Sequence, residues 1–196
     1  MKFSLFLGIA AGILQLATYG LYSWHVSKGK SQPNATTWTV WAFLSVMSAS
    51  SYTVMTDDFA KYFLLVVSGV ANVATFFYAL VAGKFMRIQR WDWLVLCLGI
   101  LSGLVWWEYQ SAAYANFIVV VADALAFFPM YRGLWSNPSL EYPLPWFLWT
   151  LAYALTVLVI ALRWNGHYQD LVSPICMVFL HLAVGLLALR KTTETT

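Results

Sequence analysis

Charged residues are scarce in this 196-residue chain. Only 10% of its residues are Asp, Glu, Lys or Arg, whereas 61% are hydrophobic. A typical soluble domain carries charge on about 25% of its residues, so this composition excludes an ordinary soluble domain. The formal net charge of +3 is too small and too scattered to indicate a nucleic-acid partner. We therefore expect an integral membrane protein whose immediate surroundings are the lipid bilayer.

Reactive and metal-binding motifs are missing as well. The two cysteines, Cys97 and Cys176, each stand inside an apolar run and have no neighbours at metal-ligand spacing. The sequence has no HExxH or GxSxG motif and no acidic pair suited to a metal. No predicted membrane span has a central lysine, which excludes a retinal Schiff base. We expect no metal, no cofactor and no enzymatic activity.

Long apolar runs are what the chain does contain. A transmembrane helix needs about 20 mainly apolar residues, and only helices and closed barrels satisfy their own backbone in lipid. The runs show no alternation of period two, which excludes a barrel. The sequence predicts seven transmembrane helices, at about 3–25, 37–55, 62–83, 93–109, 113–133, 144–163 and 172–190.

An internal repeat organises these helices. The stretches Pro33–Trp41 and Glu141–Trp149 each lead into a helix with the pattern W-x-x-W, and the second follows the first after 108 residues. Two homologous halves in a membrane protein indicate a transporter whose site lies between them. We predict an all-α fold of two parallel three-helix bundles, at 1–85 and 111–192, joined by a linker loop and helix at 86–110 and followed by a tail at 193–196.

The distribution of basic residues predicts the orientation in the membrane. Cytoplasmic loops carry an excess of Lys and Arg. Alternating through seven spans places three basic residues on the side of the N-terminus and eight on the other side. The N-terminus should therefore lie outside and the C-terminus in the cytoplasm, and the short chain suggests a bacterial inner membrane. The three on the outer side are Lys2, Lys61 and Arg163.

Polar residues recur near the middle of six of the predicted spans. An ionisable side chain at this depth costs at least about 2.5–3.5 kcal/mol and by default indicates a functional site. Asp123 and His181 are ionisable, and we expect them to face the interior, where Asp123 could pair with His181 or with Asn72. Small polar residues can instead serve only helix packing. The candidate substrate-binding residues at this depth are Gln15, Ser48, Asn72, Asp123, Tyr153 and His181.

Aromatic residues and helix breakers add further candidates. Tryptophans at span ends, such as Trp24, are expected in the interfacial aromatic belt. Trp41 and Trp149 occur once per half and one turn deeper, so we predict that they stack on a ring-shaped ligand or close the inner gate. Pro129 and Gly20 are candidate hinges, because proline and glycine let a helix bend; a kink without motion is the alternative.

The chain resembles the PQ-loop/SWEET superfamily of membrane transporters. The resemblance rests on the arrangement of three, one and three helices and on the segment Gln15–Trp38, above all K-G-K-S before a polar helix start. The family's Pro-Gln dipeptides would fall at Leu21-Tyr22 and Pro129-Met130, where only Pro129 matches. The resemblance implies alternating access and a pocket at mid-depth.

By the same resemblance, the pocket would be bounded by Asn72 and His181, and proton coupling would fall to Asp123. Vitamin-precursor carriers of the nicotinamide riboside type share this fold and resemble the chain faintly at Tyr19–Trp24. We therefore expect a transporter of a small polar solute such as a sugar, a vitamin precursor or an amino-acid-like molecule. The alternatives are a ligand-binding receptor on the same fold and, less favoured, a membrane-embedded enzyme. The chain could also form a homo-oligomer.

Overall fold

The protein is all-helical over the part of the chain that the structure, a computed structural model, describes. That part comprises residues 2–84 and 112–190, with isolated positions at Trp93, Cys97, Ile100, Leu104 and Glu108. Within it lie six α-helices and one short 3-10 helix. Their bounds are α1 Lys2–Ser27, α2 Ala35–Met55, α3 Phe59–Val81, α5 Ala112–Ser136, η1 Pro138–Leu140, α6 Pro143–Leu162 and α7 Gln169–Leu189.

Six of the seven predicted spans correspond to these helices, with ends that differ by a few residues. The prediction at 93–109 lies outside the continuously described residues, so the count of seven stays a prediction. Within the described residues, five helices are long and apolar enough to cross a membrane: α1, α3, α6, α7 and the Asn116–Ser136 part of α5. The helix α2 is not among the five because serines and threonines interrupt its apolar residues, several of them on its buried face. The protein is thus an all-α membrane protein.

Side chains at the helix starts explain where two of the helices begin. The Asn34 side chain accepts a hydrogen bond from the Thr37 backbone N–H at 2.9 Å and caps α2. The Asp58 carboxylate accepts a hydrogen bond from the Ala60 backbone N–H at 3.1 Å and caps α3. Such caps satisfy backbone donors that a helix leaves unpaired in its first turn.

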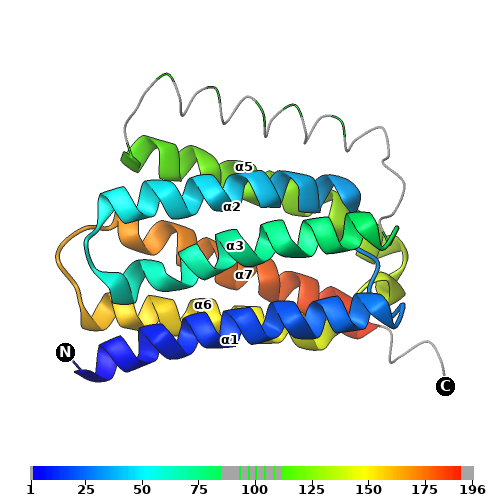
Figure 1. Cartoon of the computed structure of the whole chain (residues 1–196), viewed down its shortest axis with the longest axis horizontal. Coiled ribbons are helices and arrows are strands. Elements are labelled where there is room, and N and C mark those ends of the chain that lie inside the picture. The colour runs from blue at the N-terminus through cyan, green and yellow to red at the C-terminus, as the bar shows by residue number, and fades with distance from the viewer. Residues whose placement is uncertain are drawn as a thin grey trace.

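The six described helices form a closed ring. Going round the ring, α1 packs against α3, α3 against α2, α2 against α5, α5 against α7, α7 against α6, and α6 against α1. Figure 1 shows that α1, α3, α5 and α7 run in one direction along the bundle, while α2 and α6 run in the other. The end of α3 and the start of α5 lie at opposite ends of the bundle. A ring of this kind leaves a central axis that every helix can reach.

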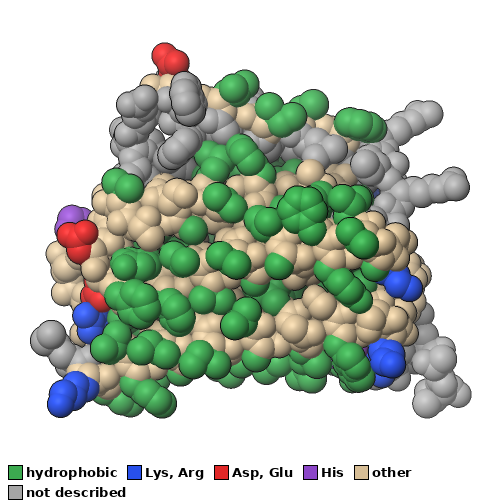
Figure 2. Space-filling model, in the orientation of Figure 1, with side chains coloured by type: hydrophobic (Ala, Val, Ile, Leu, Met, Phe, Trp, Pro, Cys, Tyr) green, Lys and Arg blue, Asp and Glu red, His purple; other side chains and the backbone are tan. Residues whose placement is uncertain are grey.

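The outer surface of the ring is apolar. Phe6, Val70, Phe117 and Phe179 expose more than half of their side-chain surface, which in water would be unfavourable. Figure 2 shows hydrophobic side chains spread over the face in view and charged side chains gathered towards its two ends. Exposed Trp24 lies in the last turn of α1, as an interfacial anchor would. This distribution fits a bundle surrounded by lipid.

A close approach of α1 and α3 gives the first testable prediction. A Cβ atom on Gly8 would lie 2.5 Å from the Ala60 carbonyl oxygen and 3.0 Å from its Cα, whereas one on Gly20 would meet nothing within 4 Å. We expect Gly8→Ala to force the two helices apart and to lower stability by about 1–3 kcal/mol, the usual cost of overpacking. Thermal unfolding of the purified protein in detergent measures this as a lower Tm.

Gly20→Ala is the matched control on the same helix. Alanine favours a helix over glycine by about 0.5–1 kcal/mol, so the Tm of this variant should stay the same or rise slightly. An equal loss of Tm in both variants would contradict the close approach. Because Gly20 and Pro129 both lie inside unbroken helices, α1 and α5, their hinge roles stay predictions.

Candidate functional site

A cavity lies on the axis of the ring, and all six described helices contribute to its wall. Its volume is about 40 Å³, measured as the space open to the centres of water-sized molecules. One water needs about 10–15 Å³ by this measure, so the cavity has room for a few waters or a small ligand fragment. The side chains that line it are Tyr19, Trp38, Trp41, Ser45, Ser48, Leu65, Ser68, Asn72, Asp123, Phe127, Trp149, Tyr153, Ser173, Met177 and His181.

Seven of the eight predicted substrate-binding residues line this cavity. They come from five different helices, and the structure brings them together around one space. The eighth, Gln15, lies behind the wall: it is fully buried and its Nε2 donates a hydrogen bond to the Ser68 hydroxyl at 2.8 Å. Gln15 can therefore position Ser68 without touching a ligand. The seven are Trp41, Ser48, Asn72, Asp123, Trp149, Tyr153 and His181.

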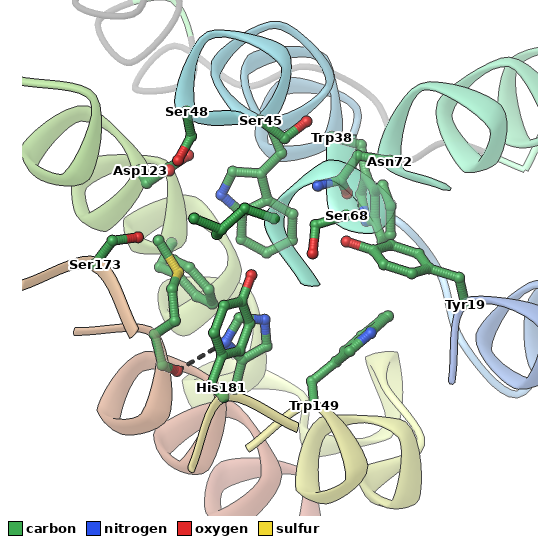
Figure 3. Close-up of a pocket in the computed structure, with 15 residues that line it drawn as sticks. Tyr19, Trp38, Ser45, Ser48, Ser68, Asn72, Asp123, Trp149, Ser173 and His181 are labelled. Carbon is green, nitrogen blue, oxygen red and sulfur yellow. Dashed lines mark hydrogen bonds between the residues drawn. The ribbon is translucent and has the colours of Figure 1, made fainter. Parts of the chain in front are cut away.

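Asp123 is a nearly buried carboxylate with 7% of its surface exposed. Its side chain lies near Ser48 at one edge of the cavity (Figure 3). Within residues 2–84 and 112–190, no donor forms a hydrogen bond or ion pair with this carboxylate. A charged carboxylate held away from water without a partner is unfavourable by several kcal/mol. Asp123 can therefore bind a proton or a positively charged ligand group.

His181 stands within a group of aromatic rings. Its ring centroid lies 5.2–6.5 Å from the centroids of Trp41, Phe127, Trp146, Trp149 and Tyr153. The Nδ1–H of His181 donates to the Met177 carbonyl at 2.8 Å, which Figure 3 marks. The pairing with Asp123 that the sequence suggested is not formed: Nδ1 bonds to its own helix, and within the described residues no contact joins the ring to the Asp123 carboxylate. The ring presents its faces to the aromatic group.

The two W-x-x-W patterns meet inside the ring. The Trp38 and Trp149 rings lie 6.5 Å apart, and the Trp41 and Trp146 rings lie 6.2 Å apart. Each pair joins a tryptophan of the first half to one of the second. All four side chains are at least 94% buried, so Trp38 and Trp146 do not belong to the interfacial belt. The tryptophans form an aromatic wall between the cavity and the end of the bundle where α2 and α6 begin.

A buried carboxylate, Glu141, lies beyond this aromatic wall. It accepts hydrogen bonds from the Tyr22 hydroxyl at 2.9 Å and from the Trp146 indole N–H at 3.4 Å. In the same region the Gln32 backbone N–H donates to the Leu140 carbonyl at 2.8 Å, which joins the two loops at this end. We call Tyr22, Glu141 and Trp146 the inner cluster. From the sequence, Glu141 was predicted only as part of a helix start.

A buried ion pair lies at the opposite end. Lys61 Nζ and Asp170 Oδ2 are 2.7 Å apart, with side-chain exposures of 1% and 2%. The Tyr52 hydroxyl donates to the Asp170 backbone carbonyl at 2.8 Å, which adds α2 to this contact. We call Tyr52, Lys61 and Asp170 the outer cluster. Lys61 was predicted as a cation of the outer side; it lies in the first turn of α3 and binds a carboxylate of α7, and its side of the membrane stays a prediction.

The cavity also contains residues that the sequence analysis did not select. The signal that could have found them is helical spacing, because residues three or four apart share one face of a helix. Ser68 precedes Asn72 by four residues on α3, and Met177 precedes His181 by four on α7. The pair of Lys61 and Asp170 could be found by its spacing of 109 residues, which is also that of Asn72 and His181. The missed lining residues are Tyr19, Trp38, Ser45, Leu65, Ser68, Phe127, Ser173 and Met177.

Several buried polar atoms at this site have no partner within the described part of the chain. They are Gln15 Oε1 and the indole nitrogens of Trp38, Trp41 and Trp149. A buried donor or acceptor left unsatisfied costs about 1–3 kcal/mol, and such atoms gather at functional sites. Three of these four belong to residues that line the cavity.

Comparison with known proteins does not assign the chain to a family. No family model, no curated protein and no solved structure matches the chain.

Proposed function

We propose that the chain is an alternating-access transporter of a small polar solute. The observation that carries this proposal is the cavity itself, which is lined by polar and aromatic side chains of all six described helices and lies between one cluster of contacts towards each end of the ring. A solute held there could leave in either direction if one cluster opened while the other stayed closed. A channel, by contrast, needs a continuous path.

The contacts within the ring support the predicted pair of three-helix bundles. Exchanging α1 with α5, α2 with α6 and α3 with α7 reproduces the order of the helices around the ring, although α3 contacts α6 more extensively than α7 contacts α2. The bundles would then be α1–α3–α2 and α5–α7–α6, which meet where α1 packs on α6 and α2 packs on α5. Because α3 ends and α5 begins at opposite ends of the ring, the chain needs one further crossing between them. This supports seven spans and the PQ-loop/SWEET resemblance.

In this proposal, transport is a rocking motion of the two bundles about the cavity. Opening the outer cluster would separate Lys61 from Asp170, which lie in different bundles. Opening the inner cluster would separate Tyr22 from Glu141 and part the tryptophans. Pro129 and Gly20 would absorb the bending of α5 and α1. With the N-terminus outside, as the basic residues predict, the outer cluster faces the periplasm of a bacterial cell.

Asp123 would couple transport to protons. It is the cavity carboxylate without a hydrogen-bond or ion-pair partner in the described ranges, so binding a proton removes its uncompensated charge. If the carboxylate binds a proton on one side of the membrane and releases it on the other, the proton gradient can drive transport of the solute. Receptor function on the same fold is the alternative, because a buried cavity can bind without moving its ligand.

A counterflow experiment tests transport against binding. Purified protein is screened by thermal shift against sugars, nucleosides, vitamins and amino acids. Each compound that raises Tm is then loaded into proteoliposomes, and entry of the labelled compound is followed. We expect labelled compound to accumulate inside proteoliposomes above the level in protein-free liposomes. Compounds that raise Tm without any exchange would overturn transport and favour a receptor.

A further inference from the structure

The charge inside the cavity is one-sided. Asp123 is the only Asp, Glu, Lys or Arg among the described residues that line it. Lys61, a buried cation of α3 that does not line the cavity, is held by Asp170 at 2.7 Å in the outer cluster. His181 is the other ionisable group of the wall apart from two tyrosines, and its Nδ1–H is directed to a backbone carbonyl. A ligand thus meets one carboxylate and no lysine or arginine.

Aromatic rings are the largest group in the rest of the wall, ahead of four serines and Asn72. Six of the lining side chains carry phenyl, phenol or indole rings, and they come from α1, α2, α5 and α6. The face of an aromatic ring attracts a cation, with tryptophan the strongest, and the attraction grows when water is excluded. An anionic or strongly hydrated ligand would gain nothing from these faces. The six are Tyr19, Trp38, Trp41, Phe127, Trp149 and Tyr153.

A carboxylate beside several aromatic faces is the arrangement that recognises an organic cation. We propose that the solute of this cavity is a small organic cation with a substituted or quaternary ammonium group, held by Asp123 and by the six aromatic side chains that line the cavity. This inference rests on the proposed function, because it names the substrate class of the same site. A neutral sugar compensates no charge, so Asp123 would have to bind a proton as well, whereas an ammonium group neutralises the carboxylate directly. The small cavity volume favours a compact cation.

Two probes of the same shape separate charge from size. Choline has a quaternary nitrogen, and 3,3-dimethylbutan-1-ol has a carbon at that position and is neutral. Binding of each to the purified full-length protein in detergent can be followed by tryptophan fluorescence, since Trp38, Trp41 and Trp149 line the cavity. We expect choline, and tetramethylammonium likewise, to bind at least about tenfold more tightly than the neutral alcohol, because cation–π contacts are strong in a desolvated site.

Three variants assign the preference to the cavity. Asp123→Asn keeps nearly the same side-chain shape and should bring the affinities for choline and for the neutral alcohol to within about threefold of each other. Trp41→Leu should weaken the binding of choline at least about fivefold and the binding of the neutral alcohol less, because leucine keeps an apolar surface but has no ring face. Asp57→Asn removes an exposed carboxylate outside the cavity and should leave both affinities unchanged. Size-exclusion profiles and Tm values show that each variant is folded.

Equal binding of choline, tetramethylammonium and the neutral alcohol to the unmodified protein would overturn the inference, and this comparison needs no variant. Unchanged choline preference in Asp123→Asn would also overturn it. The outcome is separate from that of the proposed function. If the protein exchanges a neutral solute and shows no preference for choline, the transport proposal holds and the organic-cation proposal fails. If it binds choline tightly but does not exchange choline, the organic-cation proposal holds and the transport proposal fails.

Discussion

Asp123→Asn is expected to lower uptake of the transported solute by roughly ten- to a hundredfold and to remove its dependence on pH. Hydrogen bonds to a charged group contribute about 1.5–3 kcal/mol, and each 1.4 kcal/mol corresponds to about tenfold. Asparagine keeps the shape of aspartate but neither binds a proton nor carries charge. Initial uptake rates in proteoliposomes, measured at several external pH values, test both parts of the prediction.

The control for this prediction is Asp57→Asn, which removes an exposed carboxylate between α2 and α3. Its uptake and pH profile should match those of the unmodified protein. Because Asp123 has no hydrogen-bond partner in residues 2–84 and 112–190, its replacement breaks no contact and removes a buried charge, so the Tm should stay the same or rise. Full uptake by Asp123→Asn would remove both roles of Asp123. A pH dependence that survives the change would move proton coupling to His181, the other ionisable group near the aromatic wall.

Lys61→Met is expected to destabilise the protein by about 3–5 kcal/mol, because it leaves the buried Asp170 carboxylate without its partner. The two charged groups lie 2.7 Å apart with almost no exposed surface, so water cannot replace the lost contact. For a domain of this size the change corresponds to a decrease in Tm of roughly 10 °C. Thermal unfolding in detergent, followed by circular dichroism, provides the measurement.

The double variant Lys61→Met/Asp170→Leu shows whether the loss of stability comes from the unpaired Asp170 charge. Replacing both partners of a buried ion pair with apolar residues is often neutral or even stabilising, so its Tm should recover to within a few degrees of the unmodified protein. Lys84→Met, which removes an exposed lysine just after α3, is the control and should unfold at the original temperature. A Lys61→Met variant as stable as this control would contradict the buried pair.

If the outer cluster closes the cavity on that side, the double variant has a functional consequence as well. It should remain folded but lose the ionic contact between α3 and α7, and thus spend more time open at the outer end. Losing a contact that is formed only in the closed conformation raises the population of the open conformation. A membrane-impermeant thiol reagent, tested on a cysteine introduced at Ser173, would then react faster in the double variant than in the Ser173→Cys protein.

Much of the site could be predicted because depth in a membrane is a property of the local sequence. Counting residues from the ends of each apolar run placed Ser48, Asn72, Asp123 and His181 at a common level, and the cavity lies at that level. Gln15 was placed at the correct depth but on the wrong side of the wall. Depth does not say which way a side chain points around the helix, and that rotation is set by the neighbouring helices.

The sequence by itself determined the class of protein and the helices. Apolar runs about 20 residues long, few charges and polar breaks between the runs follow directly from the thickness of the bilayer and the cost of unsatisfied backbone, and no distant contact is needed to read them. The tertiary structure alone decided the partners: Trp38 against Trp149, Glu141 against Tyr22, and Lys61 against Asp170. Each of these contacts joins residues more than 100 positions apart, and it exists because six helices close into one ring.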